Sequence, residues 1–267
     1  MIFGRGARAM RLRAADATDT VLGRRDRLTP PRRYLDFVGD SDFRATGQEF
    51  LNHFQDLANL KPSDRVLDVG CGIGRMARVL AGELMPPGHY DGFDIVPEAI
   101  DWCASHYQNL PVPFTFRHAD LFNSRYNPGG TNRAADFTFP YPDESFDLVI
   151  ATSVFTHLLA DGTDNYLANI RRVLAPGGRL FATWFVLDND GPLPVGAAFD
   201  FEHPQPDGAG AVADPAVPEA AVAYRESWLR ERLARHGLRL RGSLQYGRWR
   251  GTDSGLSFQD ILVADRD

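Results

Sequence analysis

The sequence predicts an α/β protein in which helices cover both faces of a doubly wound, mostly parallel sheet. Three observations support this fold class. From residue 65 onward, short apolar runs alternate with segments of helical periodicity, as in successive β-α-β units. A glycine-rich turn joins the first apolar run, 66–69, to a helix, which is typical of nucleotide-binding α/β folds. The length of 267 residues fits one large domain with additions.

The glycine turn carries the strongest functional signal. Asp68 interrupts the apolar run near its C-terminal end, and Gly70, Gly72 and Gly74 follow at every second position. Glycine permits positive φ and close approach of a ligand, and the helix after the turn offers free N–H groups. A dinucleotide fingerprint has the different spacing Gly-x-Gly-x-x-Gly, and an acid at this edge would repel a pyrophosphate. The pattern favours a ligand with a cation, such as an ammonium or sulfonium group; a tight turn without a ligand is the alternative.

Residues 65–75, Arg-Val-Leu-Asp-Val-Gly-Cys-Gly-Ile-Gly-Arg, resemble motif I of the class I S-adenosylmethionine-dependent methyltransferases. The phrases Phe-Asp-Leu-Val-Ile at 146–150 and Arg-Arg-Val-Leu-Ala-Pro-Gly-Gly-Arg-Leu at 171–180 are similar to later motifs of this family. The resemblance covers roughly residues 51–267. It implies a seven-stranded sheet whose last strand is antiparallel, S-adenosylmethionine as cofactor, and S-adenosylhomocysteine as its product.

Acids at the ends of the next two strands complete the expected cofactor site. Asp94 ends the predicted second strand about twenty residues after Gly74, where a right-handed crossover returns the chain beside the first strand. A carboxylate there can accept hydrogen bonds from both ribose hydroxyls of a nucleoside, so it does not distinguish S-adenosylmethionine from NAD. A loop acid without a partner is the alternative. The resemblance implies that Asp120, after the third strand, bonds the adenine amino group with Leu121 beside the ring.

We therefore expect the cofactor to be bound by residues of the glycine turn and of the following strand ends. These are Asp68, Gly70, Cys71, Gly72, Gly74, Arg75, Asp94, Ile95, Asp120, Leu121 and Ser153.

His157 is the predicted catalytic residue. It follows the fourth strand, at the edge that faces the transferable methyl group in the resembled fold. Oxygen methylation requires a base that takes the proton of the acceptor, and a nearby helix start would keep an imidazole neutral and basic. A packed or capping histidine is the alternative, and Asp188 and His203 are the other candidate bases.

The chain divides into three parts by pattern. Residues 1–33 are rich in arginine and are predicted to be a flexible basic leader, with a transit peptide or nucleic-acid arm as alternatives. Residues 34–60 are predicted to form an N-terminal helical lid. Residues 61–267 are predicted to form the methyltransferase domain, with substrate-side insertions at 123–139 and 188–223, the second a long loop or small cap.

Composition excludes several classes of protein. The net charge of −6 argues against a general nucleic-acid binder, and no apolar stretch is long enough to span a membrane. The two cysteines, Cys71 and Cys103, form neither a disulfide framework nor a metal-ligand pattern. We therefore expect a cytoplasmic protein without a metal site. The sequence leaves the oligomeric state open.

The predicted activity is methyl transfer to a hydroxyl of a small molecule, such as a sugar or a natural-product-like acceptor. The phrases Ser-Val-Phe-Thr-His-Leu at 153–158 and Tyr-Asn-Pro-Gly-Gly at 126–130 are similar to bacterial enzymes of that kind. No Asn-Pro-Pro-Tyr or Asp-Pro-Pro-Tyr follows the fourth strand, which disfavours methylation of base amino groups in DNA. The alternatives are a small-molecule N-methyltransferase, a non-catalytic S-adenosylmethionine-binding subunit, and a nicotinamide-dependent oxidoreductase.

Overall fold

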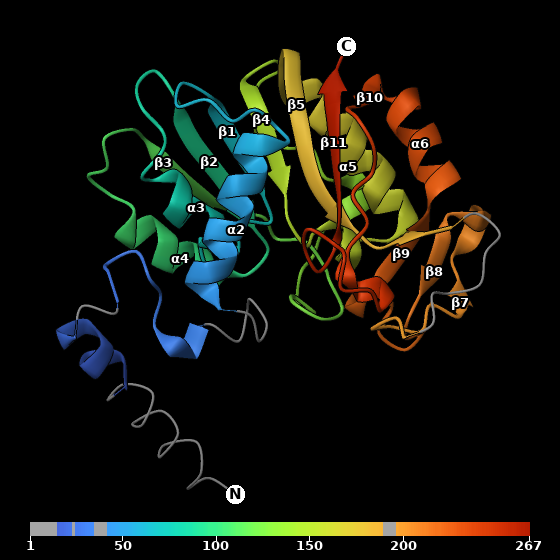
Figure 1. The fold of residues 1–267 in the computed structure, drawn as a ribbon, viewed down its shortest axis with the longest axis horizontal. Helices are drawn as coiled ribbons and strands as arrows, with labels where there is room; N and C mark the ends of the chain where they lie inside the picture. Colours follow the sequence, from blue (N-terminus) through green and yellow to red (C-terminus); the bar gives the residue numbers. More distant parts are fainter. Residues whose placement is uncertain (1–14, 23–24, 35–41, 189–195) are drawn as a thin grey trace, which may run out of the picture.

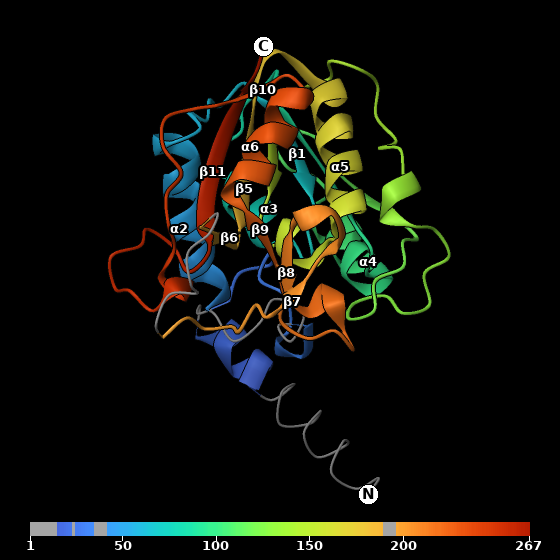
Figure 2. The same ribbon diagram turned by 90° about the vertical axis from the view of Figure 1, so that its right-hand side faces the viewer.

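The computed structural model describes residues 15–22, 25–34, 42–188 and 196–267. The predicted leader, the predicted lid and the second insertion each fall in part outside these ranges. In the described part of the chain, one large sheet is flanked by helices on both faces, and a small second sheet lies at one end (Figures 1 and 2).

The main sheet has seven strands in the order β10-β11-β5-β4-β1-β2-β3. Neighbouring strands from β5 to β3 are parallel, whereas β11 is antiparallel to both β5 and β10. The predicted seven-stranded sheet with an antiparallel last strand is therefore confirmed. The strands are β1 Arg65–Val69, β2 His89–Asp94, β3 Phe114–His118, β4 Phe146–Ala151, β5 Leu174–Trp184, β10 Leu238–Leu240 and β11 Asp260–Arg266.

Strand β1 lies at the centre of this sheet and is buried on both faces. Leu67 and Val69 pack into the core beneath α5 and α6, whereas Val66 packs into the core beneath α2, α3 and α4. This two-sided burial explains why the strand is a nearly continuous apolar run. Figure 2 shows α2 and α5 on opposite sides of the sheet. The helices are α2 Phe43–Asp56, α3 Arg75–Leu80, α4 Pro97–His106, α5 Ala160–Val173 and α6 Glu226–Arg235.

The apolar spacing of the sequence predicts helices over residues 76–84, 97–107 and 166–174, and two of their boundaries differ in the structure by more than one residue. Helix α3 ends at Leu80 rather than Leu84, because residues 81–83 continue as turns. Helix α5 begins at Ala160 rather than Tyr166, because its first turns carry few apolar residues and give no helical pattern. The start of α4 at Pro97 is confirmed, as expected for proline in the first turn of a helix.

The segment after β5 forms a small cap rather than a long loop. Its four strands have the order β6-β9-β8-β7, and Figure 1 shows β7, β8 and β9 at the end of the main sheet where its parallel strands finish. Each strand has only two to four residues, too few for a readable alternation. The strands are β6 Val186–Leu187, β7 His203–Pro204, β8 Gly210–Val212 and β9 Val222–Arg225.

The cap has its own aromatic core. Phe201 packs with its ring centroid 5.6 Å from Phe185 and 5.6 Å from Trp249, and Phe199 lies 5.1 Å from Phe185. The sequence allows two roles for Phe199 and Phe201, as part of the lining of an acceptor pocket or as part of a solvated linker. They instead hold the cap together and fasten it to the segment before β11.

A buried ion pair joins the chain around the amino end of β1. Arg179 on β5 pairs with Asp64, and the two side chains are only 7% and 4% exposed. The guanidinium also donates to the backbone carbonyls of Ala58, Asn59 and Asp147. One arginine thereby satisfies carbonyls from the α2–β1 connection and from β4.

We expect Arg179→Met to lower the free energy of unfolding by about 3–5 kcal/mol, because it leaves the Asp64 carboxylate buried without its partner. Urea denaturation followed by circular dichroism measures the change. Arg230→Met is the control, since its pair with Glu226 has an arginine that is 51% exposed and should cost less than about 1 kcal/mol. Equal losses in the two variants would contradict the assignment.

Candidate functional site

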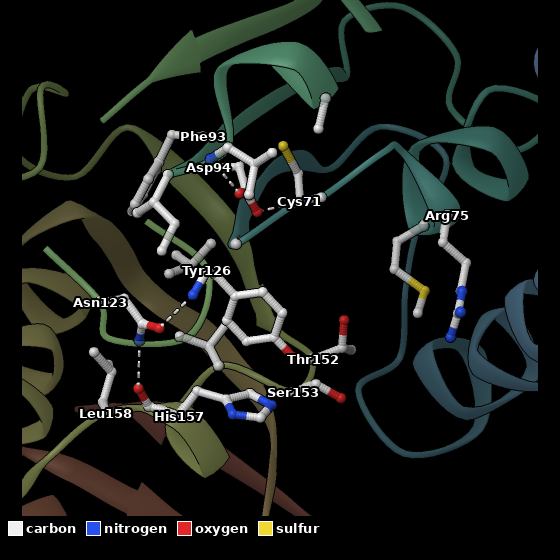
Figure 3. Close-up of a pocket in the computed structure, with 18 of the residues that line it drawn as sticks. Cys71, Arg75, Phe93, Asp94, Asn123, Tyr126, Thr152, Ser153, His157 and Leu158 are labelled. Carbon is white, nitrogen blue, oxygen red and sulfur yellow. Dashed lines mark hydrogen bonds between the residues drawn. The ribbon is translucent and has the colours of Figure 1, made fainter. Parts of the chain in front are cut away.

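A cavity of about 340 Å³ lies at the carboxyl ends of β1, β2 and β4 (Figure 3). The strand order reverses between β1 and β4, and such switch points are where open α/β sheets bind ligands. The lining residues are Phe50, Val69, Gly70, Cys71, Gly72, Arg75, Met76, Phe93, Asp94, Ile95, Val96, Ala99, Asn123, Tyr126, Thr152, Ser153, Val154, His157, Leu158 and Tyr166.

The glycine turn forms one wall of the cavity. Gly70 and Gly72 have φ of +71° and +50°, which L side chains rarely adopt. A Cβ added to Gly70 would lie 2.5 Å from Val154 Cγ2, whereas one added to Gly72 would meet no atom within 4 Å. Gly70 is therefore required for packing, and Gly72 leaves a space that a ligand can fill.

Asp94 holds this turn in place. Its Oδ2 accepts a hydrogen bond from Gly72 N at 2.7 Å, and its Oδ1 accepts one from Val96 N at 2.9 Å (Figure 3). Burial of the carboxylate raises the pKa of Asp94, against the lowering effect of these backbone donors. Each oxygen retains a further lone pair, so the carboxylate can also accept hydrogen bonds from the hydroxyl groups of a ligand.

Asp68 lies behind the turn, outside the cavity lining. It is 1% exposed, accepts a hydrogen bond from Tyr90 Oη at 2.7 Å, and its Oδ1 has no hydrogen-bond partner. Burial raises the pKa of Asp68 to about 8, so the carboxyl is largely protonated at neutral pH. From the sequence, we expected the Asp68 carboxylate to place a negative charge next to the ligand. In the structure this carboxyl group is buried and hydrogen-bonded to Tyr90 instead.

The structure brings eight of the twelve predicted site residues to the cavity. They are Gly70, Cys71, Gly72, Arg75, Asp94, Ile95, Ser153 and His157. The other four, Asp68, Gly74, Asp120 and Leu121, do not line it.

Asp120 and Leu121 do not line the cavity. The exposed Asp120 accepts a hydrogen bond from Thr131 Oγ1 at 2.6 Å, because the loop after β3 folds back over it. Leu121 is 2% exposed and packs into the core on the α5 side of the sheet. The structure therefore does not bring these two residues to the cavity, where they were expected to lie beside the adenine ring.

Ser153 has an unusual backbone conformation at the cavity wall. Its φ is +58°, a strained value for a residue other than glycine. The backbone N–H donates to Thr183 Oγ1 at 2.7 Å, and the hydroxyl donates to Gln259 Oε1 at 3.0 Å. These two bonds hold the residues after β4 in a fixed position against β5 and β11.

His157 ends a short 3-10 helix, Phe155–His157, between β4 and α5. Its Nδ1 lies 2.8 Å from the carbonyl oxygen of Glu219 in the cap. A carbonyl can only accept, so Nδ1 carries the proton and Nε2 has the lone pair. Burial is the main cause that lowers the pKa of His157. The imidazole is thus kept neutral, although through desolvation rather than the helix dipole that the sequence suggested.

Asn123 and Tyr126, from the first insertion, are site residues that the sequence analysis missed. The Asn123 side chain is a bridge: its Oδ1 accepts from the N–H groups of Arg125 and Tyr126, each at 3.0 Å, and its Nδ2 donates to His157 O at 3.1 Å. The Tyr126 ring meets the His157 ring edge to face at a centroid distance of 5.1 Å. The only signal in the sequence was the Tyr-Asn-Pro-Gly-Gly phrase.

Comparisons with known proteins agree with this geometry. A family model described as a methyltransferase domain matches residues 67–182, which include the glycine turn, Asp94 and His157. Residues 67–182 of this chain therefore match a methyltransferase domain. The predicted family, the enzyme class of this domain and the cofactor of the family, S-adenosylmethionine, are thereby confirmed.

Two relatives show the range of the similarity. Phosphoethanolamine N-methyltransferase 3 of Arabidopsis thaliana is 25% identical over 166 residues, 61% of this chain and 29% of that protein. The 27-O-demethylrifamycin SV methyltransferase of Amycolatopsis mediterranei is 30% identical over 172 residues, 64% of this chain and 55% of that protein. The match therefore spans less than two thirds of the length of either relative.

A solved structure has a similar fold. It is the 1,6-didemethyltoxoflavin-N1-methyltransferase of Burkholderia thailandensis, crystallised with 1,6-didemethyltoxoflavin and S-adenosylhomocysteine. The likeness has a TM-score of 0.53 at 16% identity and covers 98% of this chain and 89% of that chain. At this identity the likeness concerns the fold alone.

Among the residues that the structure describes, no helix is long and apolar enough to cross a membrane. In the same part of the chain, no three or more histidine, cysteine, aspartate or glutamate side chains gather where they could hold a metal ion.

We expect Asp94→Asn to weaken binding of S-adenosylhomocysteine about tenfold or more. The new side-chain NH2 group would face one of the two backbone N–H donors, and the charged hydrogen-bond acceptor would be lost. Isothermal titration calorimetry measures the dissociation constant. Asp91→Asn is a control on the same strand, since Asp91 accepts from Thr115 outside the cavity. Unchanged affinity in Asp94→Asn would remove this residue from the cofactor site.

Asp68→Asn should change how stability depends on pH. Burial raises the folded-state pKa of Asp68 to about 8 from an ordinary value of 3.8, so the wild type loses stability as the pH rises between these values. We expect the variant to gain stability relative to wild type from about pH 5 to about pH 8, by at most about 1.4 kcal/mol per pH unit. Urea denaturation across this range measures the difference, and a pH-independent difference would contradict the burial argument.

Proposed function

We propose that this chain transfers a methyl group from S-adenosylmethionine to a hydroxyl group of a small molecule, a sugar or a natural-product-like acceptor. The observation that supports this proposal most strongly is His157. It is a neutral imidazole that lines the same cavity as the glycine turn, and its proton is held on Nδ1 by the Glu219 carbonyl.

The residues around the glycine turn fit the cofactor. The open space at Gly72 gives a place for close approach of the ligand, and the Asp94 carboxylate keeps lone pairs for ribose hydroxyls. Ile95 offers an apolar surface beside Asp94, and Ser153 stands at the end of β4. When bound, S-adenosylmethionine supplies an electrophilic methyl group on a sulfonium sulfur.

The residues on the His157 side perform the proton transfer. The acceptor oxygen forms its new bond to the methyl carbon as the methyl–sulfur bond breaks, and that electron pair passes to sulfur. Nε2 of His157 takes the hydroxyl proton and later releases it to solvent. The cavity walls hold the reacting oxygen in position, and such positioning supplies much of the acceleration in a displacement of this kind.

The charges near His157 favour a hydroxyl over an amine. At neutral pH an alkylamine acceptor enters as an ammonium ion. Among the described residues that line the cavity, Asp94 is the only carboxylate, and both of its oxygens already accept backbone N–H groups. Arg125 adds a positive charge that lowers the pKa of His157. The relatives above include a phosphoethanolamine N-methyltransferase and a 27-O-demethylrifamycin SV methyltransferase, so this local charge is the basis for preferring a hydroxyl acceptor.

We expect His157→Gln to lower kcat about 100-fold, because the base is lost, while the dissociation constant of S-adenosylhomocysteine stays within about twofold. The wild-type rate should fall as the pH drops through the pKa of His157, which lies below its ordinary value of 6.5, since only the neutral ring accepts a proton. The variant should lack this inflection. The assay is transfer of a labelled methyl group to a panel of hydroxylated metabolites.

His89→Gln is the matched control, because His89 lies at the start of β2, away from the cavity. This variant should keep the rate and pH profile of the wild type. If His157→Gln also keeps both, His157 is not the base.

A further inference from the structure

We propose that Tyr126 selects the acceptor, and that the preferred acceptor is an aryl hydroxyl whose ring lies against Tyr126 while its oxygen reaches Nε2 of His157. This inference rests on the proposed function and narrows its acceptor class. It concerns a residue of the first insertion, outside the motifs of the methyltransferase domain.

Tyr126 lies inside the cavity rather than at its rim. Figure 3 shows its ring between the Asp94 side of the cavity and His157, with the hydroxyl directed toward Thr152 and Ser153 at the end of β4. The hydroxyl makes no hydrogen bond with any residue that the structure describes. The ring therefore presents both a flat apolar surface and a polar group to whatever enters the cavity beside His157.

Asn123 fixes the distance between Tyr126 and His157. One buried amide, 5% exposed, accepts from the N–H of Tyr126 and donates to the carbonyl of His157. The Arg125 guanidinium lies 5.5 Å from the centroid of the Tyr126 ring and restrains it. Asn123 is thus a positioning residue that holds the Tyr126 ring and His157 at a fixed separation.

Besides the Tyr126 hydroxyl, Thr152 and the reacting nitrogen of His157, the polar groups at this end of the cavity are already paired, which leaves too few for a sugar. The Ser153 hydroxyl donates to Gln259, and the Asn123 oxygen already accepts two hydrogen bonds. The walls next to His157 include the apolar side chains of Val154 and Leu158. A sugar would leave several buried hydroxyls unpaired, which is costly. An aryl hydroxyl has one polar group to satisfy, and its ring gains from edge-to-face or stacked contact with Tyr126.

The test uses protein loaded with S-adenosylhomocysteine and two probes of the same shape class, 2-naphthol and its saturated analogue decahydro-2-naphthol. Saturation-transfer NMR and titration measure their dissociation constants. We expect wild type to bind 2-naphthol about tenfold more tightly than the saturated probe. Tyr126→Ala should abolish this preference, whereas Tyr126→Phe should retain most of it because the ring remains.

Tyr246→Ala is the matched control, since Tyr246 is 42% exposed and bonds Glu226 away from the cavity. It should bind both probes as wild type does, and urea denaturation shows that each variant is folded. Equal affinity for the two probes in wild type, binding of neither, or an unchanged preference in Tyr126→Ala overturns the inference.

Activity is measured separately with labelled S-adenosylmethionine and the same probes. The inference is supported if Tyr126→Ala methylates 2-naphthol more slowly because its KM is raised. It also requires that His157→Gln methylates 2-naphthol more slowly because its kcat is lowered. Selective binding of 2-naphthol without methyl transfer to any acceptor would count against the proposed function, while the role of Tyr126 in acceptor choice would stand.

Discussion

The bond between Asp94 and the backbone of Gly72 is the constraint on which the site depends. It connects the turn after β1 to the end of β2, two strands that are neighbours in the sheet. A glycine at positive φ has many other conformations available in isolation. The carboxylate selects one of them, and the selected shape leaves open space at Gly72 where a larger residue would fill it. The burial that raises the pKa of Asp94 is therefore the cost of holding the turn in the shape that a ligand needs.

The other half of the cavity is built from segments that are far apart in the sequence. The first insertion supplies Asn123, and the cap supplies Glu219, whose side chain also accepts a hydrogen bond from Ser124. Both segments meet at His157. The open α/β sheet thus provides one edge of the cavity, while two additions to it orient His157.

The sequence predicted those parts of the molecule whose signals are local. The apolar run at β1, the glycine turn and Pro97 at the start of α4 all determine structure within a few residues. The cap strands were missed because pairs such as His203–Pro204 are too short to show a period. The position of Asp68 was also beyond local reasoning, since its burial depends on Tyr90 from a neighbouring strand. Tyr126 and His157 are thirty-one positions apart in the sequence, and only the tertiary fold brings their rings together.

The partner of His157 in the cap is a main-chain oxygen rather than a side chain. A carbonyl is present whatever amino acid stands at position 219, so the side chains of the cap can diversify without disturbing the imidazole. The side chains of the cap can therefore change while the orientation of the His157 ring is kept.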